Sequence, residues 1–287
     1  MSDYRDFPMP ALVAEQSRAW LDTPEAERTE STPKPSSTVM LLREAAEGVE
    51  VFVIRRASTM PFAPGMVAFP GGGVDPRDAD LDLPWSGPSA QEWAARLDTD
   101  EDRARELVIA AAREVFEECG VLLAGDGAVE PGEPGHVVTD LTDPSWEAER
   151  SALLDRSQSF AEMLTRLGLV LRTELLALRG HWTTPVCEPR RYDTRFFAAR
   201  MPSGQVADAM TSESERVAWA RPADVLAAFA AGREVLLPPT EVMLEELAEI
   251  PPGAQALDAW LAEPVPVTRV QPWPVEHSGA LWMRMPV

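Results

Sequence analysis

The chain has 287 residues, 45% of them hydrophobic, and a formal net charge of -21 that gives a pI near 4.5. This length allows one elaborated domain or two average domains around a sizeable core. The charge excludes a protein that follows nucleic-acid phosphates through a basic surface, so we expect no nucleic-acid partner, and it favours divalent cations as ligands.

The N-terminal segment gives no sign of export. Its first sixteen residues lack the basic start and apolar run of a signal peptide, and no later stretch offers the roughly 20 apolar residues of a membrane-spanning helix. Cys119 and Cys187 are too few for a disulfide framework, so we expect a cytoplasmic protein without membrane contact. Residues 1–37 are predicted to form an extension that ends in a linker, because STPKPSS at 31–37 favours neither helix nor ladder.

A folded domain is predicted over residues 38–263. Two β-branched and apolar runs separated by a Gly-containing turn predict a hairpin at 38–56. MVAFPGGGVD at 66–75 predicts a short strand that ends in a glycine loop. The polar residues 77–105 predict a surface insertion with one short helix at 90–97.

A second insertion is predicted at 124–172, where apolar residues between 143 and 167 recur at helical spacing. The strands expected after it cover 175–184, 192–200 and 216–220, and the helices cover 222–232, 239–249 and 253–263. A tail with several Pro and Trp residues covers 264–287. The pattern predicts an α/β domain in which a mixed sheet lies between helices, with helical insertions and a helical C-terminal part.

One predicted helix, at 110–121, concentrates negative charge. Its apolar stripe consists of Val108, Ala111, Ala112, Val115, Cys119 and Leu122. Glu114, Glu117 and Glu118 share a neighbouring arc, where like charges repel by about 0.2–0.5 kcal/mol per pair. Gly120 is placed to end the helix, so these carboxylates lie at the negative end of the helix dipole. The alternative to a solvated acidic face is a compensating hard cation, Mg²⁺ or Mn²⁺.

The sequence REVFEECGV at 113–121, preceded by FPGGGVD at 69–75, resembles the signature of the Nudix hydrolase family, G-x5-E-x7-R-E-U-x-E-E-x-G-U, in which U is apolar. The second half matches at Arg113, Glu114, Val115, Glu117, Glu118, Gly120 and Val121. The first half departs from it, since about thirty residues separate the glycines from the helix. Eight residues before Arg113 stands Arg105 instead of Glu, with Glu106 one place later.

A long insertion at this point is similar to a subgroup of the family typified by peroxisomal acyl-coenzyme A diphosphatases. WTTPVCEPRRYDTRFF at 182–197 and LPPT at 237–240 add to this resemblance, which covers residues 38–240. It implies a Nudix-type α/β/α sandwich that hydrolyses a nucleoside diphosphate linked to another group with bound Mg²⁺ or Mn²⁺. Coenzyme A or acyl-coenzyme A is the substrate that the subgroup implies.

The resemblance also implies roles for residues of the acidic helix. Glu117 and Glu118 become the principal metal ligands, and Glu114 becomes a further ligand or a carboxylate that orients water. The Gly71 carbonyl becomes a backbone ligand, with Gly72 beside the substrate. Arg113, one turn before Glu117, is placed to orient a carboxylate through a bidentate pair.

Further candidates lie later in the chain. The family places a carboxylate in a loop before a late strand that ends in Trp, which implies Glu213 or Glu215, with Glu213 preferred. The basic residues that could bind an anionic substrate are Arg55, Arg56, Arg190, Arg191 and Arg195. Two alternatives stay open, a hydrolase for ADP-ribose, NADH or a similar compound, and a non-catalytic Nudix-like nucleotide-binding module. A homodimer is the family's habit.

Overall fold

A mixed sheet forms the centre of the protein, whose computed structural model describes residues 4–60, 63–80, 82–127, 136–208 and 214–286. Among these residues the sheet has the strands β2 (Lys34–Ala45), β3 (Gly48–Arg56), β4 (Val67–Ala68), β5 (Gly71–Gly73), β9 (Leu176–Thr183), β10 (Tyr192–Arg200), β11 (Ser214–Ala220) and β12 (Arg269–Val270). Its order is β11-β3-β2-β10-β9-β12, with β4 paired to β3 and β5 paired to β2. Since β10 is parallel to β2 and antiparallel to β9, the predicted mixed sheet is confirmed.

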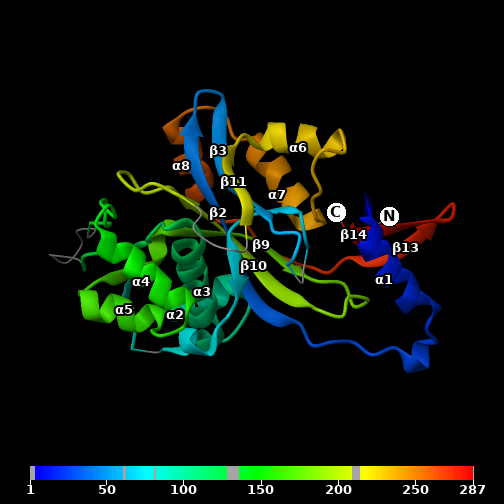
Figure 1. Ribbon diagram of the computed structural model, residues 1–287, viewed down its shortest axis with the longest axis horizontal. Coiled ribbons are helices and arrows are strands. Elements are labelled where there is room, and N and C mark those ends of the chain that lie inside the picture. The colour runs from blue at the N-terminus through cyan, green and yellow to red at the C-terminus, as the bar shows by residue number, and fades with distance from the viewer. Residues whose placement is uncertain (1–3, 61–62, 81, 128–135, 209–213, 287) are drawn as a thin grey trace.

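Helices cover both faces of this sheet (Figure 1). On one face lie α2 (Ala90–Leu97), α3 (Glu101–Cys119), α4 (Pro144–Leu154) and α5 (Phe160–Leu167), and on the other lie α6 (Pro222–Ala230), α7 (Pro238–Ala248) and α8 (Ala254–Ala262). Successive strand residues point to opposite faces. Val39 and Leu41 of β2 therefore join the core with α3, whereas Met40 and Leu42 join the core with α7. The layers form the α/β/α sandwich that we predicted.

The elements predicted after residue 172 are confirmed within two residues of their observed ends. The strands expected at 175–184, 192–200 and 216–220 are β9, β10 and β11, and the helices expected from 222 onward are α6, α7 and α8. The hairpin at 38–56 is also confirmed, because β2 and β3 pair antiparallel across a turn.

Two predictions near the first strands are wrong. Residues 34–37, expected in a linker, begin β2 and pair with β10. Pro35 is tolerated there because it stands at the beginning of the strand, and its carbonyl accepts a hydrogen bond from the Val74 N–H, at 3.0 Å. The glycines at 71–73, expected in a loop, form β5, which pairs antiparallel with residues 36–38 of β2.

The two predicted insertions meet in a second sheet, in which β6 (Trp85–Ser86), β8 (Val170–Arg172) and β7 (Ala124–Gly125) lie in that order. The short helix expected at 90–97 is confirmed as α2, which begins at a capping box between Ser89 and Glu92. Trp93 of α2 is fully buried, and its ring packs edge-on against Phe197 of β10 at 5.9 Å between centroids. The first insertion is therefore part of the core, which corrects the expectation of a surface segment.

The two ends of the chain form a third sheet, of order β1-β14-β13, beside the helix α1. These elements are β1 (Tyr4–Pro8), α1 (Ala11–Asp22), β13 (Trp273–His277) and β14 (Ala280–Pro286). Phe7, Met283 and Met285 join the core with α7. The predicted extension and tail thus meet at one place, where Figure 1 shows the N and C labels side by side.

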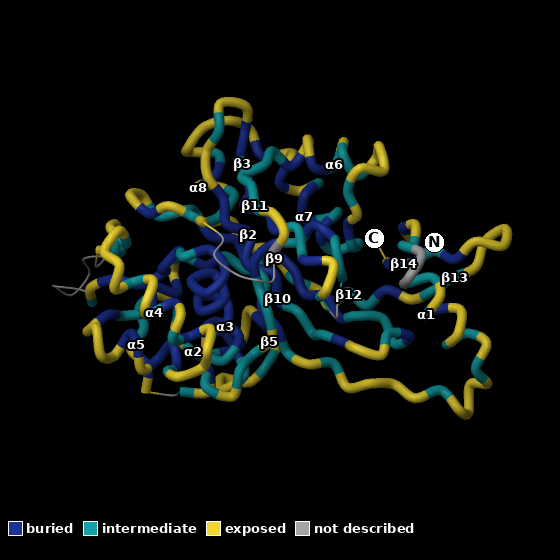
Figure 2. Tube along the Cα trace, viewed as in Figure 1, coloured by how far each residue is buried: buried dark blue, intermediate teal, exposed yellow. Residues whose placement is uncertain are grey.

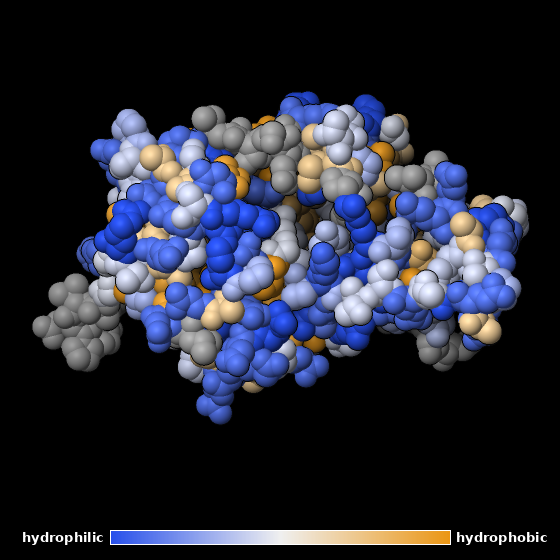
Figure 3. Space-filling view, turned by 60° about the horizontal axis from the view of Figure 1, so that its bottom comes forward, coloured by the Kyte–Doolittle hydropathy of each residue, from blue (hydrophilic) through white to orange (hydrophobic). Residues whose placement is uncertain are grey.

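Burial and surface character follow from these layers. The acidic helix α3 runs through the interior as a dark blue, buried segment (Figure 2). On the face shown in Figure 3 hydrophilic residues dominate, and hydrophobic ones show in separate patches. The described helices include none with the length and apolar character required to cross a membrane. Short 3-10 helices complete the fold, η1 (Glu25–Glu27), η2 (Pro76–Ala79) and η3 (Thr173–Leu175).

Candidate active site

The acidic helix α3 is fixed at both ends. The Asp100 side chain accepts a hydrogen bond from the Arg103 N–H at its start, at 2.8 Å. Gly120 ends it in the left-handed region, with φ of 66°, as predicted. The expected apolar stripe is confirmed, since all six of its residues are 0% exposed. The carboxylates of Glu114, Glu117 and Glu118 consequently have defined positions in the last turns.

These carboxylates are buried, which excludes a solvated acidic face. Glu114 and Glu117 are each 9% exposed and Glu118 is 8% exposed. The guanidinium of Arg113 donates from Nη1 to Glu114 Oε1 at 2.8 Å and to Glu117 Oε2 at 3.1 Å, and the Gly71 N–H donates to Glu118 Oε2 at 2.8 Å. Burial raises the pKa of Glu117 and raises the pKa of Glu114 to about 7, although Arg113 opposes both shifts.

Arg113 has a third carboxylate partner, which its position in the sequence did not indicate. Asp78 of η2 accepts a bidentate pair from it, with Nε–Oδ1 at 2.8 Å and Nη2–Oδ2 at 3.0 Å. Arg113 also donates to the Gly73 carbonyl at 3.0 Å. The bidentate partner is thus Asp78, whereas the sequence suggested a carboxylate one turn along the helix.

The position of Asp78 completes the first half of the Nudix signature. It stands six residues after Gly72, where the pattern G-x5-E requires its acid, so the insertion begins after this acid. Counting forward from the glycines would have found it, whereas counting back from the helix led to position 105. There Arg105 stacks on the Trp85 ring, at 4.4 Å to the centroid, and Glu106 pairs with Arg103. Neither takes the place of the signature acid.

Arg150 of α4 compensates the unfavourable end of the helix dipole. Its side chain is 2% exposed, and its Nε donates to the backbone carbonyl of Glu117 at 2.8 Å. Its Nη1 pairs with Asp208 at 2.6 Å. A cation at the last carbonyls of a helix is stabilising. Part of the positive charge that the acidic helix requires therefore comes from the protein.

The remaining negative charge of these carboxylates could be balanced by a metal ion. Among the described residues, no group of three acidic, His or Cys side chains is assembled into a ready metal site. Three buried carboxylates, those of Asp78, Glu114 and Glu117, nevertheless share the single guanidinium of Arg113, and the buried carboxylate of Glu118 accepts from the Gly71 N–H. Excess negative charge on hard oxygen ligands suits a divalent cation such as Mg²⁺. The residues thus fit such an ion in charge and ligand type.

The glycine strand β5 lies against these acids because it has no side chains. A Cβ at Gly72 would stand 2.5 Å from Glu114 Oε1. A Cβ at Gly71, whose φ is 155°, would stand 2.4 Å from the backbone carbonyl of Ser37. Only glycine therefore lets this strand pair with β2 and touch the carboxylates together.

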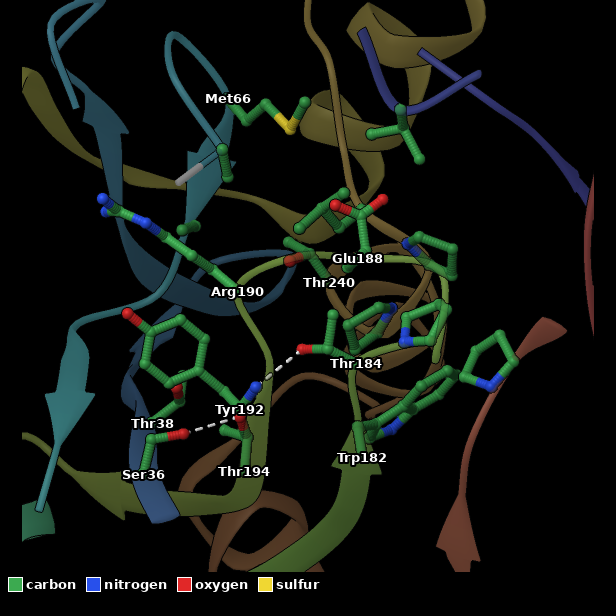
Figure 4. A pocket seen from close by; sticks show the side chains of 18 of the residues that line it. Ser36, Thr38, Met66, Trp182, Thr184, Glu188, Arg190, Tyr192, Thr194 and Thr240 are labelled. Carbon is green, nitrogen blue, oxygen red and sulfur yellow. Dashed lines mark hydrogen bonds between the residues drawn. The ribbon is translucent and has the colours of Figure 1, made fainter. Parts of the chain in front are cut away.

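The same glycines form part of the wall of a pocket of about 500 Å³. Its apolar lining includes Met9, Met66, Phe69, Trp182, Phe196 and Met283. Polar groups cluster on one side (Figure 4), where Ser36 and Thr194 share a hydrogen bond of 2.7 Å between their hydroxyls. The N–H of Tyr192 donates to Thr184 Oγ1 at 3.0 Å. The glycine strand thus lies between a largely apolar cavity and the acids of α3, which are not among the described residues that line the cavity.

Comparison with known proteins decides the family. A family model described as the NUDT19 Nudix domain matches residues 100–247, slightly more than half of the chain. The chain belongs to the Nudix hydrolase family. A crystal structure of a Nudix hydrolase from Alicyclobacillus acidocaldarius is 29% identical, has a TM-score of 0.65, and covers 80% of this chain and 97% of its own. The likeness in sequence and fold agrees with the signature on α3.

Curated relatives of this Nudix hydrolase are longer. A Caenorhabditis elegans protein named as nudix hydrolase 7 is 27% identical over 200 residues, which are 70% of this chain and 56% of the relative. The human acyl-coenzyme A diphosphatase NUDT19 is 26% identical over 223 residues, 68% of this chain and 59% of the relative. The chain therefore spans less than two thirds of the length of either relative.

Only some of the arginines that were predicted to bind the substrate of this Nudix hydrolase line the pocket. Arg56 and Arg190 line it, whereas Arg55 pairs with Glu234 at 3.1 Å. Arg191 and Arg195 are buried elsewhere, and Arg195 donates to the Leu97 carbonyl at 2.9 Å.

Strand alternation explains the position of Arg195, which we expected to contact substrate. Thr194 and Phe196 face the pocket, so Arg195 between them faces the α2 side of the sheet. Arg191 is held by the carbonyls of Thr184, at 3.0 Å, and Ser31, at 2.8 Å. The structure gives both arginines internal contacts, which corrects the predicted contact with substrate.

Of the two acids predicted in the loop before the late strand, the structure describes only one. Glu213 lies outside the described residues. Glu215 is exposed and sits at a β-bulge of β11, where its Oε1 accepts a hydrogen bond from the Ser58 N–H at 2.9 Å. This bond lowers the pKa of Glu215. Among the described residues that line the pocket, Glu215 is not present.

Proposed function

We propose that this Nudix hydrolase is a Mg²⁺- or Mn²⁺-dependent pyrophosphohydrolase that cleaves coenzyme A or acyl-coenzyme A. The products are 3',5'-ADP and phosphopantetheine or its acyl derivative. The observation that carries the proposal is the pocket, which combines a glycine wall against buried acids with an extended apolar lining. Coenzyme A has the same two parts, an anionic pyrophosphate and a long, mostly uncharged arm. The volume of about 500 Å³ lies within the usual range for small-molecule sites.

The relatives support this choice of substrate. The matching family model is that of the NUDT19 Nudix domain, and the human relative is named an acyl-coenzyme A diphosphatase. The residues that the family model matches, 100–247, include the acidic helix and β10, which contribute to the two sides of the proposed site.

The acids of α3 would hold the divalent ion. Glu117 and Glu118 would be its principal ligands, with Glu114 and the Gly71 carbonyl beside them. Such an ion, when bound, neutralises phosphate charge and makes water more acidic. Arg113 holds Glu114 and Glu117 in fixed orientations through its two hydrogen bonds. The Glu114 carboxylate, held in place by Arg113, would orient the attacking water or bind the ion as a further ligand.

The substrate's phosphates require positive charge in an acidic protein. Arg56 and Arg190 are the arginines among the described residues of the pocket. Their guanidiniums would pair with phosphate oxygens, because a planar fork of donors matches that geometry. The hydroxyls of Ser36, Thr38 and Thr194 add neutral donors on the same side (Figure 4).

Product analysis tests the proposal. The protein is incubated with Mg²⁺ or Mn²⁺ and, in separate reactions, coenzyme A, an acyl-coenzyme A, ADP-ribose, NADH and nucleoside triphosphates. We expect metal-dependent release of 3',5'-ADP from the coenzyme A compounds, slowed at least about 100-fold in Glu117→Gln. Cleavage of ADP-ribose or NADH with coenzyme A left intact would replace the proposed substrate. Cleavage of none by the folded protein would favour a binding role.

A further inference from the structure

Glu188 is the only carboxyl group among the described residues that line the pocket. It lies between β9 and β10, in a turn where its own N–H donates to the Pro185 carbonyl at 3.2 Å. Figure 4 shows its carboxyl group projecting into the open space between it and Met66. Its buried Oε1 has no hydrogen-bond partner within the described part of the protein.

This arrangement is unfavourable for the protein alone. A buried polar atom without a partner costs free energy, because the hydrogen bonds it made with water are lost on folding. The backbone hydrogen bond to Pro185 and the contact of Cys187 Sγ with Ser17 Oγ at 3.4 Å hold the turn. Neither contact involves the Glu188 side chain, so the turn does not need it for its shape. Desolvation raises the pKa of Glu188 to about 7. A ligand bound in the pocket could therefore supply the hydrogen bond that this carboxyl oxygen lacks.

The chemistry of the pocket restricts what this partner can be. A phosphate beside Glu188 would place two anions in a poorly solvated space, which is disfavoured. Phosphates find cations instead at Arg56 and Arg190. A neutral donor, such as a hydroxyl or an amide N–H, satisfies the carboxyl group without adding charge. In a largely apolar cavity, a placed polar group distinguishes ligands by their hydrogen-bonding group far better than the cavity distinguishes them by their methylene groups.

We propose that Glu188 selects the substrate by binding a hydroxyl or amide N–H on the arm that is attached to the nucleoside diphosphate. This inference rests on the proposed function and deepens it, because it assigns a specificity-determining residue to the part of the substrate that does not react. The glycine wall and the arginines receive the diphosphate, and Glu188 receives the arm.

The test separates the two halves of the substrate by using the two products as inhibitors. Phosphopantetheine contains the arm, and 3',5'-ADP does not. In Glu188→Met, which keeps an unbranched side chain of similar length and removes the carboxyl group, we expect KM for coenzyme A and Ki for phosphopantetheine to rise about 5- to 10-fold. We expect kcat and Ki for 3',5'-ADP to stay within about twofold, and the thermal midpoint not to fall. Glu188→Gln keeps an acceptor oxygen and should recover most of the affinity.

The matched control is Glu246→Met. Glu246 is another carboxyl whose pKa is raised by desolvation, and it lies at an exposed position of α7 outside the described pocket lining. Its replacement should leave all four constants unchanged. Unchanged constants in Glu188→Met, or equal weakening of both products, would overturn the inference.

The proposed function can fail separately. If the wild type cleaves no coenzyme A, binding of phosphopantetheine is measured directly by calorimetry. Binding that is weakened in Glu188→Met would still support the role of Glu188, and absence of binding to the wild type would overturn it.

Discussion

At the scale of single residues, Asp78 shows how one acid outside the acidic helix holds the site together. Its side chain is 1% exposed and receives both bonds of the Arg113 pair. We expect Asp78→Asn to lower the free energy of unfolding by about 3 kcal/mol, because it leaves a buried guanidinium partly uncompensated. Chemical denaturation measures this change. Asp82→Asn, an exposed acid nearby, is the control and should change stability by less than about 0.5 kcal/mol.

Glu188 gives stability a dependence on pH that follows from its surroundings. Its folded pKa of about 7 lies above the ordinary value of 4.5, and desolvation is the cause. Between pH 4.5 and about pH 7, Glu188 is deprotonated in the unfolded chain and still protonated in the folded chain. The free energy of unfolding therefore falls as pH rises through this range. The other charged or titratable groups near Glu188 are Arg56 and Arg190, which also line the pocket, and the thiol of Cys187, which precedes it in the chain.

We therefore expect Glu188→Gln to match the wild type in stability near pH 4. Above pH 7 the variant should be more stable by about 1–2 kcal/mol, a value reduced for the partial exposure of the side chain. Denaturation curves across this pH range measure the difference between the two proteins. A constant difference at all pH values would show that the carboxyl group titrates alike in the folded and unfolded chains.

At the scale of elements, β5 carries the contact between the sheet and the acidic helix. In Gly72→Ala the new Cβ would meet Glu114 Oε1 at 2.5 Å, so the carboxylate must move while the strand remains paired. We expect activity to fall about 100-fold, with a change in stability within about 1 kcal/mol. The control is Gly73→Ala, whose Cβ would meet nothing closer than the Pro35 carbonyl at 3.9 Å. Equal losses in both variants would contradict this account.

Elements with a clear repeat could be predicted from the sequence, and contacts between distant segments could not. The spacing of apolar residues and the position of Gly120 predicted the C-terminal part of α3 and its end, because both signals are local, but the start at Glu101, nine residues before the predicted one, was missed. Arg150 lies 33 residues from the carbonyl of Glu117 that it binds, and no local pattern connects them. Residues 34–37 form a strand because β10 lies beside them, with β5 along residues 36 and 37. The placement of Arg195 likewise required the register of β10, which separates the two faces of the sheet.

At the scale of the whole molecule, the terminal sheet closes one side of the pocket. Pro8, Met9 and Met283 contribute to the lining, and Phe7 is 2% exposed beneath the sheet. We expect Phe7→Ala to cost about 3 kcal/mol of local stability and to raise KM for coenzyme A. Hydrogen exchange should show protection lost together in β1 and β14, with β2 and β10 unaffected. Val206→Ala, at an exposed position, is the control.

Loss of protection in β1 alone would show that the two ends do not behave as one unit. Loss throughout the central sheet would show instead that Phe7 supports the whole fold. Either result would contradict the account in which the terminal sheet is a single unit that closes the pocket assigned to the coenzyme A arm.

The pairing of Tyr4 with Pro286 also sets an order of events during synthesis. The strand β1 is synthesised long before its partner β14, because nearly all of the described residues lie between them in the sequence. At about 5–20 residues per second the first strand waits roughly 15–60 s with its edge unpaired. The wall of the pocket can therefore close only after β14 has emerged, so a ribosome-bound chain that has already folded its acidic helix still lacks a complete place for the substrate arm.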